Sequence, residues 1–389
     1  MMKVLFVINN FYLRGNGLCS SARRTVTYLR EAGVDVRVLS GSNPDPDGPQ
    51  PEYSLHDYNL PVFDGLVQAQ GYQFAAPDMD IIRQAVAWAD VVHLEEPFPL
   101  EYRAGHLARK MGKAVTATYH LHPENLLASV HIDRFGTLTR TMMRLIRDLV
   151  YSSCSDIQCP TMNVMDRLDR FKFKQRMHLI SNGLVLGPER EVAGRDLPAS
   201  EPFTVINIGR LSVEKDQETL LKAMRFTRHA RDIRLVFAGK GPMEENYRKM
   251  GEKLVADGIL AREPEFLFLD EAGLRSLVRS AGLFVHCAYI EVEGLSCLEA
   301  LQEGIVPVIA DGPLTATAQF ALDRMSIFPV KSPRALARRI DWWIEHPERR
   351  KALEPAYAAL ARDYDIRKSI RQLISMFETA LADPRPQAD

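Results

Sequence analysis

Residues 204–227 read TVINIGRLSVEKDQETLLKAMRFT, and residues 233–256 read IRLVFAGKGPMEENYRKMGEKLVA. Each stretch begins with a short apolar run, passes through a glycine-containing turn and continues with apolar residues at helical spacing. They predict strands over 204–208 and 233–238, and helices over 217–227 and 243–256. Successive strand–helix units indicate a parallel sheet with helices on its faces.

The alternation continues beyond these two units. It predicts further strands at 265–269, 283–286 and 306–310, and helices at 271–280 and 295–303. Open parallel sheets bind ligands at the carboxyl ends of their strands. Chemistry is therefore expected in three loops: 209–216, 239–242 and 287–294.

The first half of the chain repeats the pattern less regularly. Strands are predicted at 3–8, 34–39, 90–94 and 114–119, with a helix over 20–32. The segment 185–202 contains several glycines and prolines without clear periodicity, which is typical of a hinge. We therefore expect an α/β protein with two Rossmann-like doubly wound domains, at residues 1–184 and 185–365.

Composition limits the class of protein. With 46% apolar and 25% charged residues the chain resembles a soluble globular protein, and a net charge of -1 gives no general case for nucleic-acid binding. No apolar run reaches the roughly 18 residues that cross a bilayer. The five cysteines lack the paired spacing of a zinc site or a disulfide framework. A cytoplasmic protein, soluble or peripherally bound to a membrane, is expected.

The loop 209–216 combines a glycine turn with two cations. Gly209 ends the strand, and Arg210 and Lys215 flank a turn whose following helix presents free backbone N–H groups. Cations and a helix N-terminus together favour a diphosphate ligand. A solvated turn with one internal salt bridge explains the same residues equally well.

The stretch 290–301 reads IEVEGLSCLEAL. Glu291 lies in the loop, Glu299 lies eight residues later in the helix, and Gly294 allows a tight turn against a ligand. Carboxylates accept hydrogen bonds from the vicinal hydroxyls of a sugar or ribose. A surface helix with ordinary acidic residues would not explain why Glu299 stands among apolar neighbours.

The spacing of Glu291 and Glu299 resembles a motif of family 4 of the retaining glycosyltransferases with the GT-B fold, in which two domains face each other across a cleft. Four further motifs occur in the family's order: Thr118-Tyr119-His120, Ser181-Asn182-Gly183, Gly209-Arg210-Leu211 with Glu214-Lys215, and Ala238-Gly239-Lys240-Gly241-Pro242. Within the family the N-terminal domain looks like that of diacylglycerol glucosyltransferases. The family's closing helices are similar to 333–345 and 366–381, so residues 366–389 are expected to form a C-terminal helix that could pack back on the N-terminal domain.

The resemblance implies a role for each matching residue. Arg210 and Lys215 would neutralise the donor diphosphate, Glu299 would bind the ribose and Glu291 a hydroxyl of the donor sugar. The remaining donor-binding positions are Gly209, Gly239, the backbone of Gly294 and Leu295, and the glycine loop of Gly15 and Gly17. His120 of the N-terminal domain would lie beside the donor sugar. His120, Arg210, Lys215 and Glu291 are thus the expected catalytic group, with no metal and no cofactor besides the nucleotide sugar.

Three positions leave the family pattern or stay open. Glu293 replaces the usual phenylalanine, and either alters sugar choice or faces solvent. Asn16 separates two glycines that are commonly adjacent. His122 would share a side with His120 if the strand alternation continued; a structural role and a functional one are both open.

The acceptor is expected in the N-terminal domain. Residues 134–178 contain nine Arg and Lys against four Asp, with arginines at helical spacing beside apolar residues. Such a surface can lie on anionic lipid, or can be an ordinary solvated helix. The leading hypothesis is retaining transfer of glucose from UDP-glucose to a lipid such as diacylglycerol, at the cytoplasmic face of a membrane. The alternatives are a soluble or cell-envelope saccharide acceptor, a nucleotide-sugar epimerase and a non-catalytic sugar-binding protein.

Overall fold

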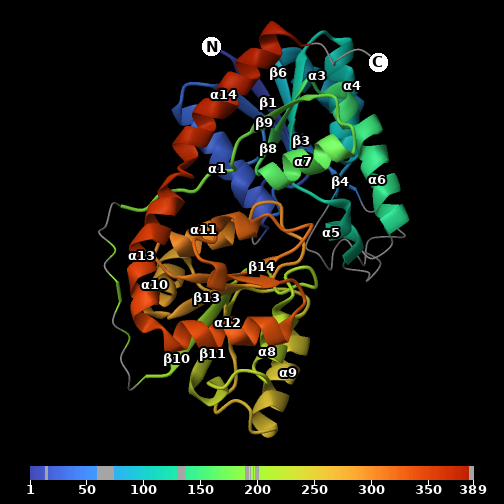
Figure 1. Cartoon of the computed structure of the whole chain (residues 1–389). Helices are drawn as coiled ribbons and strands as arrows, with labels where there is room; N and C mark the ends of the chain where they lie inside the picture. Colours follow the sequence, from blue (N-terminus) through green and yellow to red (C-terminus); the bar gives the residue numbers. More distant parts are fainter. Residues whose placement is uncertain are drawn as a thin grey trace. The chain divides into compact units, whose positions relative to one another are not determined.

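The computed structural model describes residues 1–13, 16–58, 74–128, 136–188, 192, 194–195, 197 and 201–384 (Figure 1). The chain divides into two compact units: unit 1 comprises Met1–Gly183 and Ile366–Asp389, and unit 2 comprises Leu184–Asp365. Each unit contains a parallel sheet with helices on its faces. The predicted pair of Rossmann-like α/β domains is confirmed.

Unit 1 is built on a sheet that has seven strands within the described residues, in the order β3-β2-β1-β6-β7-β8-β9. All of its pairings are parallel. The strands are β1 (Lys3–Val7), β2 (Asp35–Gly41), β3 (Tyr53–Leu55), β6 (Val91–Leu94), β7 (Ala114–Thr118), β8 (Asp156–Cys159) and β9 (Arg176–Leu179), and a separate antiparallel pair joins β4 (Asp57–Tyr58) to β5 (Phe74–Ala75). The helices are α1 (Gly17–Glu31), α3 (Met79–Trp88), α4 (Pro99–Lys110), α5 (Pro123–Ala128), α6 (Gly136–Leu149), α7 (Met162–Arg170) and α14 (Ile366–Ala382).

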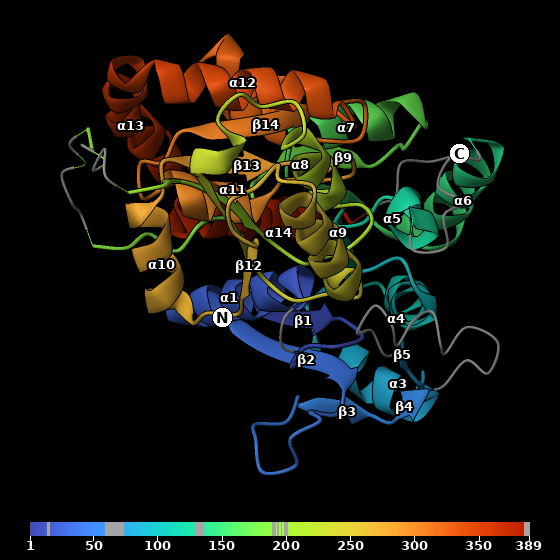
Figure 2. The ribbon, with the colours of Figure 1, turned by 90° about the horizontal axis from the view of Figure 1, so that it is seen from below.

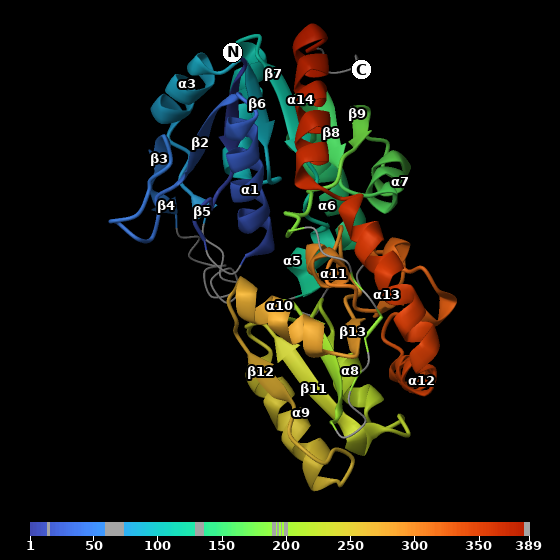
Figure 3. The same ribbon diagram turned by 90° about the vertical axis from the view of Figure 1, so that its left-hand side faces the viewer.

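The strands β6, β7 and β8 are buried along their whole length because helices cover both faces of the sheet. Val4, Phe6 and Val7 of β1 are fully buried. The helices α1 and α14 pack together, with α14 against β6, β7 and β8, as Figure 3 shows. The last helix of the chain thus completes the first unit.

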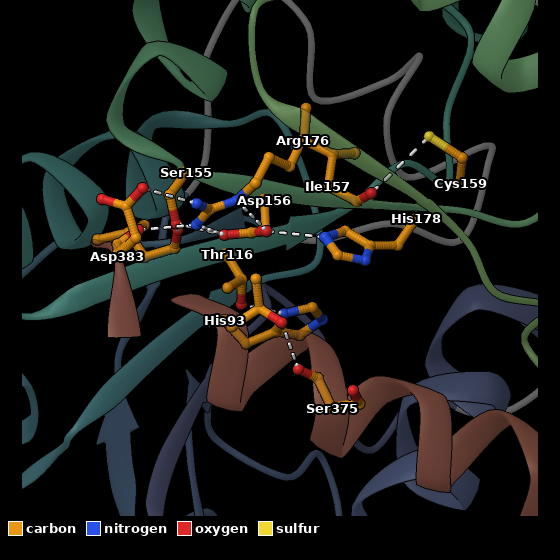
Figure 4. A network of polar contacts seen from close by, with 12 residues as sticks. His93, Thr116, Ser155, Asp156, Ile157, Cys159, Arg176, His178, Ser375 and Asp383 are labelled. Carbon is orange, nitrogen blue, oxygen red and sulfur yellow. Dashed lines mark hydrogen bonds and ion pairs between the residues drawn. The ribbon is translucent and has the colours of Figure 1, made fainter. Parts of the chain in front are cut away.

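A polar network fastens the end of α14 to the sheet of unit 1 (Figure 4). Arg176 of β9 donates to both carboxylate oxygens of Asp156, at 2.8 and 2.7 Å, and to the carboxylate of Asp383, at 3.0 Å. His178 Nε2 lies 2.7 Å from Asp156. Burial alone would raise the pKa of Asp156, but His178 and Arg176 lower it to about 2. One buried carboxylate thereby organises two strands and a helix from the far end of the sequence.

Unit 2 is built on a sheet that has six strands within the described residues, in the order β12-β11-β10-β13-β14-β15. The strands are β10 (Phe203–Ile208), β11 (Ile233–Ala238), β12 (Glu265–Leu267), β13 (Leu283–His286), β14 (Pro307–Asp311) and β15 (Ile327–Pro329). The helices are α8 (Gln217–Ala223), α9 (Glu244–Ala256), α10 (Glu271–Ser280), α11 (Leu295–Leu301), α12 (Pro333–Glu345) and α13 (Pro347–Arg362). Figure 2 shows α12 beside α8.

Strand order determines where the loops of unit 2 meet. Ile206 of β10 pairs with Val236 of β11 on one side and with Phe284 of β13 on the other. The strand order reverses direction at β10, and such a switch point places neighbouring loops on opposite sides of a crevice. The loops after β10, β11 and β13 therefore come together at one edge of the sheet.

The predicted elements differ from the observed ones mainly at their ends. β12 ends at Leu267 instead of residue 269, and Phe268 is 63% exposed. α8 ends at Ala223 instead of residue 227. The helix α13 had no predicted counterpart, because Pro355 lies inside it and proline normally argues against a helix interior.

Candidate functional site

Two loops of unit 2 are joined backbone to backbone. Leu211 N–H donates to the carbonyl of Lys240 at 3.0 Å, and Met243 N–H donates to the carbonyl of Leu211 at 3.0 Å. Gly239 has φ +154°, and a Cβ there would lie 2.0 Å from the Gly209 carbonyl oxygen. A Cβ on Gly241 would lie 2.2 Å from the carbonyl of Leu211. The glycines of this segment are needed for the close approach of the two loops.

The third loop is joined to the first and to the segment after β14. Tyr289 N–H donates to the Glu214 carbonyl at 3.0 Å. Glu291 N–H donates to the Leu314 carbonyl at 2.8 Å, and the Glu291 carbonyl accepts from Ala316 N–H at 3.0 Å. The structure thus brings the predicted loops 209–216, 239–242 and 287–294 into one site, together with residues 314–316.

Lys215 and Glu291 form an ion pair in this site. His286, at the end of β13, places Nε2 3.4 Å from the same carboxylate. Burial alone would raise the pKa of Glu291, but Lys215 and His286 lower it to about 2. Burial alone would lower the pKa of Lys215, but Glu291 raises it on balance. Both side chains are therefore charged at neutral pH and hold each other in position.

Arg210 lies partly buried beside this pair. Burial lowers its pKa, an effect that Glu214 opposes. Gln217, at the first position of α8, donates to the Arg210 carbonyl at 2.9 Å and thereby fixes the start of the loop. A partly desolvated guanidinium binds an anion more strongly than one in bulk water, because fewer water contacts are lost.

Gly294 and Glu299 stand at the start and in the body of α11. Gly294 has φ +83°, and a Cβ there would lie 2.2 Å from Thr317 Cγ2. It is the N-cap of α11, so the free N–H groups of the first turn begin at Leu295. Glu299 is partly exposed on the same helix. The structure therefore places these predicted donor-binding residues on one short helix and its N-cap.

Glu293 is buried, with 3% of its surface exposed. The interpretation that it faces solvent is wrong. It lies near Tyr364, whose pKa is raised first by burial and then by the charge of Glu293. Burial of a charged group is costly unless nearby groups compensate it. Glu293 is therefore part of the packed interior of the loop 287–294.

His120 lies in unit 1, directly after β7, and is fixed by a carboxylate. Its Nε2 is 2.8 Å from Glu95 Oε2, and Glu95 Oε1 is 3.0 Å from His93 Nε2. Burial would raise the pKa of Glu95, but His120 and His93 lower it to about 2. His93 is held in turn by Thr116 and Thr118, at 2.8 and 2.9 Å.

His122 does not share the surroundings of His120. β7 ends at Thr118, so strand alternation does not reach these residues. His122 is fully buried, and its Nδ1 lies 3.1 Å from the Tyr119 hydroxyl. Among the other N-terminal positions, Gly17 begins α1 and Gly15 lies outside the described residues.

Sequence reasoning missed Glu95 and His286. Both stand at the carboxyl end of a strand, which is where ligands of parallel sheets bind. The pair Glu95-Glu96 directly after the apolar strand 91–94 was the available signal for the first. His286 ends an otherwise apolar strand, and buried histidines of that kind are common.

Two further buried carboxylates lie beside Glu95. Asn9 Nδ2 donates to Glu96 at 3.0 Å and to Glu101 at 3.0 Å. Burial and the charge of Glu96 raise the pKa of Glu101 well above its usual value. The hydrogen bonds of Asn9 to both carboxylates hold the loop after β1 in place. In the parts of the chain that the structure describes, no group of three His, Cys, Asp or Glu side chains could hold a metal ion.

Two family models together match most of the chain. Residues 15–186 match the family model "Glycosyltransferase Family 4", and residues 190–358 match "Glycosyl transferases group 1". A GDP-mannose:cellobiosyl-diphosphopolyprenol alpha-mannosyltransferase of Xanthomonas oryzae pv. oryzae is 23% identical over 402 residues, 99% of each chain. A GDP-mannose-dependent alpha-mannosyltransferase of Mycolicibacterium smegmatis is 26% identical over 79% of each chain.

Solved structures share the fold. Sucrose-phosphate synthase from Thermosynechococcus elongatus superimposes with a TM-score of 0.72 at 16% identity, over 98% of this chain and 100% of that one. The HepE protein of Anabaena, in complex with UDP and glucose, gives a TM-score of 0.72 at 14% identity, over 97% of this chain and 100% of that one.

Proposed function

Because the chain belongs to the family 4 glycosyltransferases with the GT-B fold, we propose that it transfers a hexosyl group from a nucleoside diphosphate sugar to a lipid-linked acceptor. The observation that carries the proposal is the convergence of Arg210, Lys215 and Glu291 at the carboxyl edge of the unit 2 sheet. Two cations and a helix start fit a diphosphate, and the carboxylates of Glu291 and Glu299 fit sugar hydroxyls.

The chemistry follows from where charge develops. Cleavage of the bond between the anomeric carbon and the phosphate leaves negative charge on the diphosphate, and Arg210 and Lys215 would stabilise it. The Lys215–Glu291 pair would hold the ammonium group in place before the donor arrives, so little reorganisation is needed. We propose transfer with retention of anomeric configuration and without a metal ion. His120, oriented by Glu95, would contact the donor sugar.

The relatives favour one donor over the other. Three curated relatives that align over most of the chain are named for GDP-mannose, and two of them also for a saccharide on a diphosphopolyprenol. We therefore propose GDP-mannose as the first donor to test, with a saccharide on a diphosphate lipid as its acceptor. UDP-glucose and diacylglycerol, which the sequence resemblance suggests, are the second pair.

An exposed apolar stripe on α6 supports action at a membrane surface. Leu138, Leu145 and Leu149 are 40%, 51% and 49% exposed. At 100° per residue these three positions fall within about 40° of one another. Leucines on one exposed helix stripe can enter the interface of a bilayer. Within the described residues no helix has the length and apolarity to span one. We propose peripheral contact at the cytoplasmic face through the leucine stripe of α6, which lies within the predicted segment 134–178.

The test is a donor panel measured with and without acceptors. GDP-mannose and UDP-glucose are each incubated with the diphosphate-linked saccharide and with diacylglycerol in vesicles, and both the nucleoside diphosphate and the glycosylated lipid are quantified. Proton NMR of the product gives the anomeric configuration, and chelator gives the metal requirement. Donor conversion without acceptor would favour an epimerase, and binding without turnover of any pair would overturn the proposal.

A further inference from the structure

Five cationic side chains and one aromatic ring line a hollow of about 360 Å³ on unit 1. We call it the arginine hollow. It lies between α6 and the end of α7 and is lined by Arg140, Arg144, Arg147, Arg170, Phe171 and Lys172.

Within the described residues, the positive charge of the hollow is largely uncompensated. Arg147 pairs with Asp148, with Nε 2.7 Å from the carboxylate. For the other four cations, no carboxylate of the described residues lies within ion-pair distance. Asp148 is exposed and pairs with Arg147, and its charge also reaches Arg144. Like charges at positions i and i+4 of a helix repel, so the spacing of Arg140 and Arg144 is unfavourable without an anion.

The two walls of the hollow are fastened to each other. Arg147 donates from Nη1 to the Phe171 carbonyl at 2.7 Å, which joins α6 to the turn after α7. Lys172 follows in a left-handed conformation with φ 59°. Helix ends of this kind usually carry glycine or asparagine, because a side chain is strained there. A lysine in this position adds a cation to the hollow at the expense of backbone strain.

Stabilisation of helix ends does not account for the whole cluster. Cations near the last turn of a helix interact favourably with its dipole, which explains Arg147, Arg170 and Lys172. Arg140 and Arg144 stand in the first two-thirds of α6, where that effect has faded. Their common face is the one that meets the end of α7.

A flat bilayer does not account for the cluster either. At 100° per residue, Arg140, Arg144 and Arg147 fall within about 60° of one another and on nearly the opposite side of α6 from the exposed leucines. A bilayer that receives the leucine stripe therefore cannot also cover the arginine hollow. Convergent guanidinium groups in a concave site fit a compact polyanion, which each can bind through two parallel hydrogen bonds.

We propose that the arginine hollow binds the phosphate or diphosphate group that links an acceptor to its lipid. This inference rests on the proposed function for the identity of the acceptor. The binding of the anion itself is independent of turnover, so the two can fail separately.

Direct binding is tested first, with inorganic pyrophosphate and the full chain. Titration calorimetry is run on the wild type, on the double variant R140Q/R144Q and on the control R83Q/R103Q, which removes two exposed arginines of α3 and α4. GDP is kept at saturation to occupy the donor site. We expect R140Q/R144Q to bind about 10-fold more weakly than the control. Equal affinity in the three proteins would overturn the proposal. Circular dichroism confirms that both variants are folded.

Transfer assays then test whether the anion that the hollow binds belongs to the acceptor. The same saccharide is offered on a diphosphate-linked short lipid and on an uncharged alkyl chain, without vesicles. R140Q/R144Q should raise the KM for the diphosphate-linked acceptor about 10-fold and leave kcat, the donor KM and the uncharged acceptor unchanged. Equal effects on the two acceptors would contradict the proposal and indicate a general effect of surface charge. The same conclusion would follow if the variant lost only its binding to phosphatidylglycerol vesicles, measured separately. If neither acceptor is glycosylated, the proposed function fails, and the calorimetry still tests whether the arginine hollow binds an anion.

Discussion

The Lys215–Glu291 ion pair joins two side chains that stand in different loops and were expected to contact different parts of the donor. In the structure each fixes the charge of the other. The proposed donor site is thus organised before a donor binds, and its cation is held by a carboxylate that would also accept a sugar hydroxyl.

Replacement of Lys215 should separate catalysis from folding. For K215M we expect kcat/KM to fall about 100-fold or more, because one of two groups that stabilise the leaving diphosphate is lost. Steady-state kinetics with saturating acceptor measure this. The matched control is K222M, at an exposed lysine of α8 that pairs with Glu218. Equal kinetics in the two variants would refute the assignment of Lys215.

Glu95 is expected to act as a positioning residue for His120. E95Q keeps the shape of the side chain and removes the charge that orients the imidazole. We expect kcat to fall about 10- to 100-fold with little change in donor KM, as for other groups that orient a functional histidine. Nitrogen NMR of the histidine rings should show a changed tautomer balance at His120, and E95D should recover part of the rate. An unchanged tautomer with a lowered Tm would indicate a structural role only.

At the scale of the elements, glycines determine how closely the loops of unit 2 approach. Gly294 and Gly258 both have positive φ, +83° and +69°. A Cβ meets Thr317 at the first position and meets no atom within 4 Å at the second. Substitution of alanine at the two positions therefore separates the effect of backbone strain from that of steric exclusion.

G258A should lower the free energy of unfolding by about 1 kcal/mol, the penalty of a left-handed alanine, and leave turnover unchanged. G294A carries the same penalty and also displaces either Thr317 or the start of α11. We expect a loss of about 2–4 kcal/mol and weaker donor binding. Urea unfolding and donor titration measure the two effects. Identical behaviour of the two variants would show that the loop around Gly294 accommodates the added Cβ without further cost.

The Asp156 network gives unit 1 a defined response to acid. The pKa of Asp156 is about 2 in the folded protein and about 3.9 in an unfolded chain. Its stabilising contribution is therefore present above about pH 4 and is lost as the pH falls through about 2. In R176Q the pKa of Asp156 should rise, and acid unfolding followed by circular dichroism should begin at a higher pH than in the wild type. A superimposable acid transition would contradict this account.

On the scale of the whole molecule, the chain crosses from unit 1 to unit 2 and returns. The helix α14 buries Ile370, Leu373 and Phe377 within unit 1. Removal of residues 366–389 should therefore expose the core of unit 1 and leave unit 2 intact. We expect aggregation of the truncated chain, with unit 2 recoverable by limited proteolysis. A soluble, monomeric truncated protein with both units protected would show that α14 is dispensable.

The class of fold and most of the elements follow from the sequence alone. Apolar runs such as 204–208 and 233–238 predict strands because strand and helix periodicities are local properties of the chain. Strand order then follows from few topological rules, so the three loops around β10, β11 and β13 could be predicted to carry the chemistry. α13 was missed because its interior proline contradicts the local rule.

Which side chains contact each other depends on tertiary packing and could not be predicted. The pairing of Lys215 with Glu291, of His120 with Glu95 and of Arg176 with Asp383 joins residues that are 76, 25 and 207 positions apart. No periodicity carries that information, because such contacts depend on how helices and strands pack. The burial of Glu293 is another result of packing. The sequence therefore indicates which residues could bind a ligand, while the partner and the charge state of each residue depend on the fold.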